Sequence, residues 1–316
     1  MALGLANRFG FTRLAAFAVV AILAVAPGHA DDANGGEALS DAELALLSEL
    51  LNLDWINEPG VYAIGQTGRQ IELDERFALI LGDDARTYFE LVNGEAREQI
   101  EAVLIDNVEI SEAYYAYSDI GYVTLDDWTD VDPDDLMEGI KRATDDANRT
   151  RREVGIPEVW VRGWVTQPTL DRDAGMVYWV IEAQTADVTL LNAVALKLGR
   201  QGLEMVTWVV TPQYYMANSD ELTEIANRLT FMPGQRYADY ETGDLLAGFG
   251  IASLVATTVG ASSSKSKGVV AAVIAFLVLV LKKAWFVVIA VIAGGLAVFR
   301  RKRRQPHHPT GRPPPT

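Results

Sequence analysis

Residues 119–179 decide the fold, and they read DIGYVTLDDWTDVDPDDLMEGIKRATDDANRTRREVGIPEVWVRGWVTQPTLDRDAGMVYW. The first part is an acidic turn that contains six aspartates: Asp126, Asp127, Asp130, Asp132, Asp134 and Asp135. Apolar residues then recur at helical spacing, which predicts a helix from about Pro133 to Val154. Glu158–Thr166 and Met176–Ala183 follow as two predicted strands joined by a turn at Asp171–Gly175.

The acidic turn admits two interpretations. Asp130, Asp132 and Asp134 are spaced like the opening of a calcium-binding loop, but such a loop needs glycine at its sixth position and glutamate at its twelfth. Asp135 and Lys141 occupy those positions. The pattern therefore favours helix initiation, in which Asp132 caps the helix and Pro133 takes the first helical position.

Outside this stretch, the pattern predicts short strands that are joined closely enough to pair antiparallel. The expected strands are Val61–Ile64, Arg69–Leu73, Phe77–Leu81, Val103–Asp106, Glu112–Tyr117, Val188–Leu198, Leu203–Thr211 and Thr230–Met232. A further strand, Gly121–Leu125, is expected within the quoted stretch, before the acidic turn. Further helices are expected at Leu39–Trp55, Asp84–Val92 and Asn218–Leu229. We therefore expect an α+β fold, with an antiparallel sheet flanked by helices.

Both ends of the chain have the composition of targeting or membrane sequence. Residues 1–30 resemble a secretory signal, with Arg8 and Arg13 before an apolar run and small residues at the expected cleavage position. Residues 245–304 are predicted to anchor the chain in a membrane through apolar helices. One crossing within residues 268–299 is the preferred reading, and three crossings are the alternative. Residues 305–316 are expected to form a disordered cytoplasmic tail.

Charge is divided sharply between these regions. All 43 acidic residues lie between Asp31 and Asp244, together with 15 of the 27 basic ones, so residues 31–244 carry a formal charge of −28. A body this acidic repels phosphate backbones, which argues against nucleic-acid binding. Ten basic residues follow Asp244, and the run Arg300–Arg304 places that end on the cytoplasmic side by the positive-inside rule. The domain of residues 31–244 is then extracytoplasmic.

The chain lacks the residues of several common chemistries. It has no cysteine, and its three histidines are His29, His307 and His308, all outside residues 31–244. Thiolate nucleophiles, cysteine-bound zinc, histidine metal sites and serine–histidine catalysis are therefore unavailable to the domain. We expect neither a cofactor nor a metal.

The remaining candidates for a binding site are carboxylates, tryptophans and one arginine. They are Asp126, Asp127, Trp164, Asp171, Trp179, Arg200 and Asp239. The tryptophans could stack on a sugar, although core packing is the favoured interpretation. Arg200 stands between Gly199 and Gly202, where it could bind an anion or fix a tight turn against Asp171 or Asp239. The second reading is favoured.

Motifs distributed from Gly60 to Lys302 resemble those of a bacterial family of unknown function, described as membrane-anchored and loosely linked by prediction to amylopullulanase regulation. The motif residues are Gly121, Tyr122, Val123, Asp126 and Asp127; Asp132, Asp134, Asp135, Leu136, Ala147, Asn148 and Arg151; Gly163, Trp164, Pro168 and Asp171; Leu191, Asn192, Leu198, Gly199, Arg200 and Gly202; and Phe231, Gly234, Tyr237, Ala238 and Asp239. Leu170, Ala193 and Leu196 depart from the family's polar residues. The resemblance implies a membrane-anchored protein and no particular reaction.

Two functions are consistent with these features. The first is a non-enzymatic binding or accessory module on the periplasmic side of the inner membrane, held in the bilayer by residues 245–304 and acting on an envelope protein partner. The alternative is a carboxylate-based hydrolase that acts on glycans, with its acids among Asp126, Asp127, Asp171 and Asp239. The first requires no catalytic group and is favoured.

Overall fold

The computed structural model describes residues 41–259, except 67, 95, 110, 154–156 and 187. The predicted signal, the apolar stretch 268–299 and the tail 305–316 lie outside the described residues. Within the described part, no helix has both the length and the apolar content that a bilayer crossing requires.

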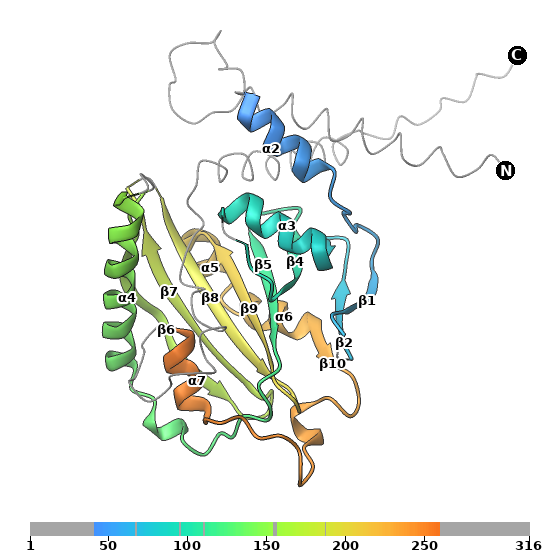
Figure 1. The fold of residues 1–316 in the computed structure, drawn as a ribbon, viewed down its shortest axis with the longest axis vertical. Coiled ribbons are helices and arrows are strands. Elements are labelled where there is room, and N and C mark those ends of the chain that lie inside the picture. Colours follow the sequence, from blue (N-terminus) through green and yellow to red (C-terminus); the bar gives the residue numbers. More distant parts are fainter. Residues whose placement is uncertain are drawn as a thin grey trace, which may run out of the picture.

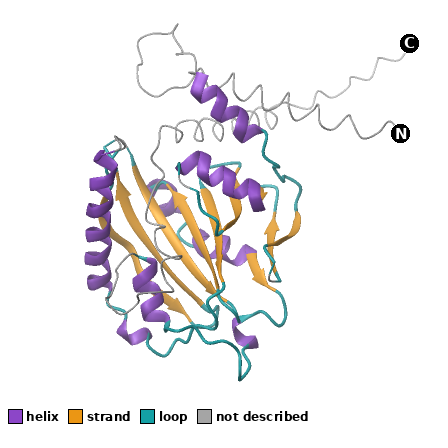
Figure 2. Ribbon diagram, viewed as in Figure 1, coloured by secondary structure: helices purple, strands orange, loops and turns teal. Residues whose placement is uncertain are grey.

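Two antiparallel sheets form the body of the domain (Figures 1 and 2). The large sheet has the strand order β3-β4-β5-β9-β8-β7-β6. Its strands are β3 (Phe77–Leu81), β4 (Ile100–Asp106), β5 (Glu112–Ser118), β6 (Trp160–Asp171), β7 (Met176–Gln184), β8 (Thr189–Leu198) and β9 (Leu203–Val210). The small sheet, in the order β1-β2-β10, consists of β1 (Gly60–Ile64), β2 (Arg69–Leu73) and β10 (Leu229–Phe231). The predicted α+β class is confirmed.

Helices cover both faces of the large sheet (Figure 1). One face packs against α3 (Gly82–Asn93), α4 (Pro133–Glu153) and α7 (Ile251–Thr258). The opposite face packs against α5 (Pro212–Ala217), α6 (Glu221–Arg228) and the small sheet. α2 (Asp41–Leu51) lies against α3, and the short 3-10 turns η1 (Trp128–Asp130) and η2 (Tyr237–Asp239) occur in loops. The domain therefore has two apolar cores, one on each side of the large sheet.

The start of α4 forms as the acidic turn predicts. Asp132 accepts hydrogen bonds from the backbone N–H groups of Asp134 (2.9 Å) and Asp135 (3.3 Å). Asp132 therefore caps the helix, and the favoured interpretation of the acidic turn is confirmed. Leu136, Met137 and Ile140 of the same helix are buried against the sheet.

The other end of α4 is tied to the chain that enters β6. The side chain of Asn148 donates to the carbonyl of Val159 (2.7 Å) and accepts from its N–H (3.0 Å). Arg151, 3 % exposed, donates to the same Asn148 oxygen (2.8 Å). Two of the motif residues thus fix α4 to the sheet.

β6 is an edge strand of the large sheet and pairs irregularly with β7. The register shifts three times, between Val161 and Gly163, between Trp164 and Thr166, and between Thr166 and Thr169. Pro168 lies inside the last irregular stretch and has no N–H to offer a further strand.

The structure differs from the expected elements in several places. Gly121–Leu125 is not a strand, because it makes one isolated bridge, from Tyr122 to Leu246. α5 was not expected, and it lies between the predicted strand Leu203–Thr211 and the predicted helix Asn218–Leu229. α7 lies within residues 245–304, which were expected to anchor the chain in a membrane, and its Ile251, Leu254 and Val255 are fully buried in the domain core.

The Asn148 contacts lead to a stability prediction. Asn148→Ala removes the partner of the partly buried backbone groups of Val159 and of Nη1 of the buried Arg151, so it should lower the free energy of unfolding by about 1–3 kcal/mol. Urea unfolding followed by tryptophan fluorescence measures the change. Arg149→Ala, at a position 67 % exposed on the same helix, is the control and should change stability by less than about 0.5 kcal/mol. Equal effects of the two substitutions would contradict the assignment.

Candidate functional site

Four loops that carry sequence motifs meet at one corner of the domain. We call residues 119–127, 171–175, 199–202 and 231–250 the motif corner. Backbone hydrogen bonds join the first and third loops, from Gly121 to the carbonyl of Gln201 (2.9 Å), and the third and fourth, from Arg200 to the carbonyl of Gln235 (3.0 Å). Residues separated by more than 100 positions therefore form one surface.

The first and last loops of the motif corner are held together along their backbones. The N–H of Tyr122 donates to the carbonyl of Leu245 (2.8 Å), and the N–H of Ala247 donates to the carbonyl of Tyr122 (2.9 Å). Gly121 precedes this contact with φ 84°, and a β-carbon there would lie 2.7 Å from the Leu245 carbonyl oxygen. This approach therefore requires glycine at position 121.

Arg200 holds the last loop, residues 231–250, in place, but its partners are not the acids that the sequence predicted. Its Nε and Nη2 donate to the two carboxylate oxygens of Asp244 at 2.7 and 2.9 Å. Nη2 also lies 3.3 Å from the carboxylate of Glu241. The expected pairing with Asp171 or Asp239 is therefore wrong, whereas the expected structural role at a turn is met by Asp244. The hydrogen bond from Arg200 holds the pKa of Asp244 below its ordinary value.

Three of the predicted site carboxylates hold local backbone. Asp127 accepts from the N–H of Ala252 (3.3 Å) at the start of α7, and Asp171 accepts from Ala174 (2.9 Å) in its hairpin turn. Asp239 accepts from Gly234 (2.8 Å) and Arg236 (3.0 Å), and these bonds, led by that from Arg236, lower its pKa. Asp171 and Asp239 therefore each fix their own loop, whereas Asp127 joins the first loop to the start of α7.

Asp126, like Asp171, is exposed, and it lies close enough to a cluster of tyrosines to act on the charge of Tyr237. The ring of Tyr122 stacks on that of Tyr237 (centroids 4.5 Å apart, planes at 11°) and against that of Tyr240 (4.2 Å, 31°). The Tyr237 hydroxyl donates to the carbonyl of Val123 (2.8 Å). Burial raises the pKa of Tyr237, and the neighbouring Tyr122 and Asp126 raise it further. The tyrosine stack was not predicted, because its members are distant in sequence.

The two predicted tryptophans do not belong to the motif corner. Trp179 is 1 % exposed in the core, so a role in stacking on a ligand is wrong for it and the favoured packing interpretation is confirmed. Trp164 donates from its indole to the carbonyl of Pro133 (3.0 Å) and thereby fixes the start of α4. It lies seven residues before Asp171 on β6, roughly 20 Å away along the strand. A cleft lined by Trp164 and the acids of the corner is therefore not formed.

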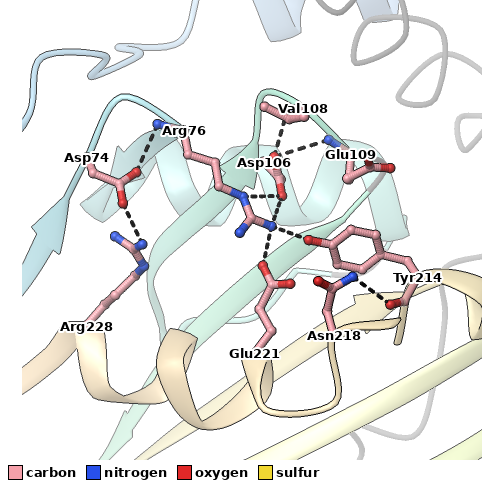
Figure 3. A network of polar contacts seen from close by, with 9 residues as sticks. All are labelled: Asp74, Arg76, Asp106, Val108, Glu109, Tyr214, Asn218, Glu221 and Arg228. Atoms are coloured by element: carbon pink, nitrogen blue, oxygen red, sulfur yellow. Dashed lines mark hydrogen bonds and ion pairs between the residues drawn. The ribbon is translucent and has the colours of Figure 1, made fainter. Parts of the chain in front are cut away.

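A second polar cluster joins β3, β4, α5 and α6 (Figure 3). The guanidinium of Arg76 donates to buried Asp106 (Nε, 2.9 Å), to Tyr214 and to Glu221. Asp106 also accepts from the backbone of Val108 (2.7 Å). Burial raises the pKa of Glu221, against the opposing effects of Tyr214 and Arg76. These residues were missed by sequence reasoning, because only the packing of α5 and α6 brings them together.

This cluster gives no sign of binding a ligand. The Arg76 charge is already shared between two carboxylates, and Asp74 beside it pairs with Arg228 (2.6 Å). Within residues 41–259, where described, no three histidine or acidic side chains are arranged to hold a metal ion.

The Arg200 pair leads to a prediction about the motif corner. Arg200→Ala should lower the melting temperature and speed amide exchange in residues 234–244, because Asp244 loses its two-point partner. Arg200→Lys should restore part of the loss, since lysine cannot make the two parallel bonds. Arg172→Ala, at an exposed position in the same corner, is the control. Equal exchange in all three variants would contradict this role.

The sign of its pH dependence follows from the lowered pKa of Asp244. Its stabilising contribution is full at neutral pH and is lost as the pH falls through that lowered pKa. The difference in melting temperature between wild type and Arg200→Ala should therefore shrink below about pH 4.

Comparison with known proteins identifies the family of this chain but no function. A search of curated proteins gives no match. Among solved structures, the chain is similar to the solution structure of cyanobacterial PsbP (CyanoP) from Synechocystis sp. PCC 6803, at 13 % identity and a TM-score of 0.36, over 56 % of this chain and 94 % of that one. A likeness of this degree says nothing about function. The family described as "Protein of unknown function (DUF2167)" matches residues 56–293, most of the chain, and the chain therefore belongs to that family.

Proposed function

We propose that this chain is a non-catalytic accessory protein, held at the cytoplasmic membrane by its C-terminal apolar segments, with its acidic domain on the extracytoplasmic side. The separation of charge supports this arrangement. Every acidic residue precedes Leu245, whereas ten basic residues follow it, and Arg300–Arg304 is basic throughout. Short basic runs beside apolar segments are retained on the cytoplasmic side.

In this proposal the motif corner binds a protein partner. Three apolar side chains are exposed together on its last loop: Tyr240 (36 %), Leu245 (74 %) and Leu246 (51 %). Exposed leucines scattered singly are ordinary, but these adjoin the tyrosine stack on a loop fixed by Arg200 and by the backbone of Tyr122. The main support for the proposal is this apolar surface, which is exposed to solvent although its loop is held firmly in place.

The chemistry of the partner follows from the surrounding charge. Asp126 is exposed beside the tyrosine stack, and the Glu241 side chain is 74 % exposed on the same loop as the leucines. The domain as a whole is strongly acidic. The matching surface is a protein segment that presents apolar side chains flanked by lysine or arginine. An anionic lipid surface would be repelled.

The alternative, a carboxylate-based glycan hydrolase, has less support. Such an enzyme needs two carboxylates free to act on either side of a glycosidic bond. Of the four candidate acids, Asp127, Asp171 and Asp239 are each engaged by backbone N–H groups.

The orientation is tested with reporter fusions in a bacterial host. Alkaline phosphatase fused after Val259 should be active, because it requires export, whereas the same enzyme fused after Arg304 should be inactive. A β-galactosidase fusion at the same two sites is the control and should show the reverse pattern. Active phosphatase after Arg304 together with inactive phosphatase after Val259 would overturn the proposed orientation.

The binding surface is tested with a photo-crosslinking amino acid at position 246 of the full chain in intact cells. A discrete protein adduct should form there and not from position 138, where the Glu138 side chain is 71 % exposed on α4. The adduct partner, once purified, should bind Leu246→Ser at least about 10-fold more weakly than wild type. Val61→Ser, at an apolar residue 60 % exposed on β1, is the matched control and should bind normally. Equal weakening by both substitutions would contradict the assigned surface.

A further inference from the structure

A buried cluster of one arginine and two glutamates lies between the two sheets. Arg69, at the start of β2 in the small sheet, is 1 % exposed. Its Nη1 lies 2.7 Å from the carboxylate of Glu101 on β4 and also donates to Glu204 on β9. The guanidinium carbon stands 3.7 Å from the ring centroid of Tyr117 on β5. Three strands of the large sheet therefore hold one side chain of the small sheet.

The charges of this cluster do not balance. One guanidinium faces two carboxylates, and the Glu204 side chain is 0 % exposed while that of Glu101 is 21 % exposed. A net negative charge in such a place is costly, and uptake of one proton removes it. Burial raises the pKa of Glu204 to about 8, with Arg69 opposing the rise and Glu101 adding to it. The two acids hold the pKa of Arg69 above its ordinary value in spite of its burial.

The geometry leaves a place for that proton. Oε2 of Glu204 accepts from Arg69, whereas Oε1 is buried and receives no hydrogen bond within the described residues. An ionised carboxylate with one oxygen unsatisfied in the interior is unfavourable. Protonation of Oε1 removes the charge without breaking the bond from Arg69.

Other groups that face Glu204 do not neutralise it. Lys197 lies opposite Glu204 in the β8–β9 ladder, but its ammonium donates to the carbonyls of Ala226 (3.2 Å) and Leu229 (2.7 Å) and to the side chain of Asn227 (2.9 Å) at the end of α6. Tyr117, opposite Glu204 on β5, contacts Arg69 with its ring face. Arg228 of α6 pairs with Asp74. Tyr115 is raised in pKa by its own burial and stays neutral.

The cluster is next to the strand that leads into the motif corner. Arg69 pairs with Phe231 of β10 in the small sheet, and the carbonyl of Gly68 accepts from the N–H of Met232 (2.9 Å). The ring of Phe231 packs closely on Gly199, the residue before Arg200. A change in how Arg69 is held therefore reaches the loop that begins at Met232.

We propose that Arg69, Glu101 and Glu204 form a pH-sensitive joint between the two sheets, closed while Glu204 holds a proton and opened when that proton is lost. In the closed state Arg69 balances one carboxylate. Loss of the proton leaves an excess negative charge in the interior, and the small sheet separates from β9 far enough to admit water. β10 and the start of the 231–250 loop then loosen.

The direction of the pH effect is fixed by the raised pKa of Glu204. The folded state holds the proton more tightly than the unfolded state, so the stabilisation is greatest below the ordinary glutamate value and is lost as the pH rises to about 8. The joint is therefore closed in acid and opens in mild alkali. The link from this opening to partner binding rests on the proposed function, whereas the joint itself does not.

The test compares the full-length chain with Glu204→Gln, which keeps the shape and an oxygen acceptor but cannot ionise. The melting temperature of wild type relative to Glu204→Gln should fall by about 4 °C or more between pH 6 and pH 9. Glu101→Gln, which leaves Arg69 with one acid, should move the transition of the remaining glutamate to lower pH and so also flatten the profile from pH 6 to pH 9. Glu72→Gln, an exposed acid on β2, is the control and should follow wild type.

Amide exchange supplies a local measurement. At pH 9 the amide of Met232 should exchange faster in wild type than in Glu204→Gln, and at pH 6 the two should agree; comparison at equal pH cancels the intrinsic rate. A constant difference in melting temperature, or equal Met232 exchange at pH 9, would overturn the joint. Faster Met232 exchange in wild type than in Glu204→Gln at pH 9 supports the joint. If the affinity for the partner is nevertheless unchanged from pH 6 to pH 9, the role of the loop in binding is contradicted.

Discussion

The buried guanidinium of Arg69 lies between the two sheets. The relative position of the sheets depends on the carboxylates that pair with this charge. A buried guanidinium without partners would oppose folding by several kcal/mol. Glu101 and Glu204 must therefore approach it from β4 and β9, and Tyr117 must lie flat beneath it. Two other arginines also form ion pairs with two acids each. Arg76 pairs with Asp106 and Glu221, and Arg200 pairs with Asp244 and Glu241. In an acidic domain with few basic residues, each of these arginines is shared between two acids and joins distant segments.

Two kinds of contact hold the motif corner together. One is the pairing of Arg200 with Asp244, and the other is close backbone hydrogen bonding between its loops. Gly121 permits the Tyr122 backbone to pair with residues 245–247, and this pairing leads the chain into α7, whose side chains complete the core. Asp127 then caps the start of α7 through Ala252. The motif aspartates Asp127, Asp171 and Asp239 accept backbone hydrogen bonds in this corner. In the proposed function, a partner would therefore contact the apolar loop and the tyrosine stack.

Local signals predicted the elements well, and long-range contacts could not be predicted. Arg69–Leu73 and Phe77–Leu81 form as expected because turn residues delimit them, and Asp132 starts α4 because the cap lies within one turn of the helix. The partner of Arg200 lies 44 residues away, and nothing in the local sequence distinguishes Asp244 from Asp239. α7 was assigned to the membrane region because a short apolar helix has the same composition in a protein core as in a bilayer. The Arg69 cluster joins positions on three strands and becomes visible only when the sheets are packed.

The irregular edge strand β6 has a consequence for the behaviour of many copies together. An open edge of a seven-stranded sheet offers a template on which an identical chain can add its own strand, and repetition of that step builds fibres. The three register shifts and Pro168 interrupt the row of donors and acceptors that such growth requires. The geometry of β6 therefore disfavours strand addition at this edge of the sheet.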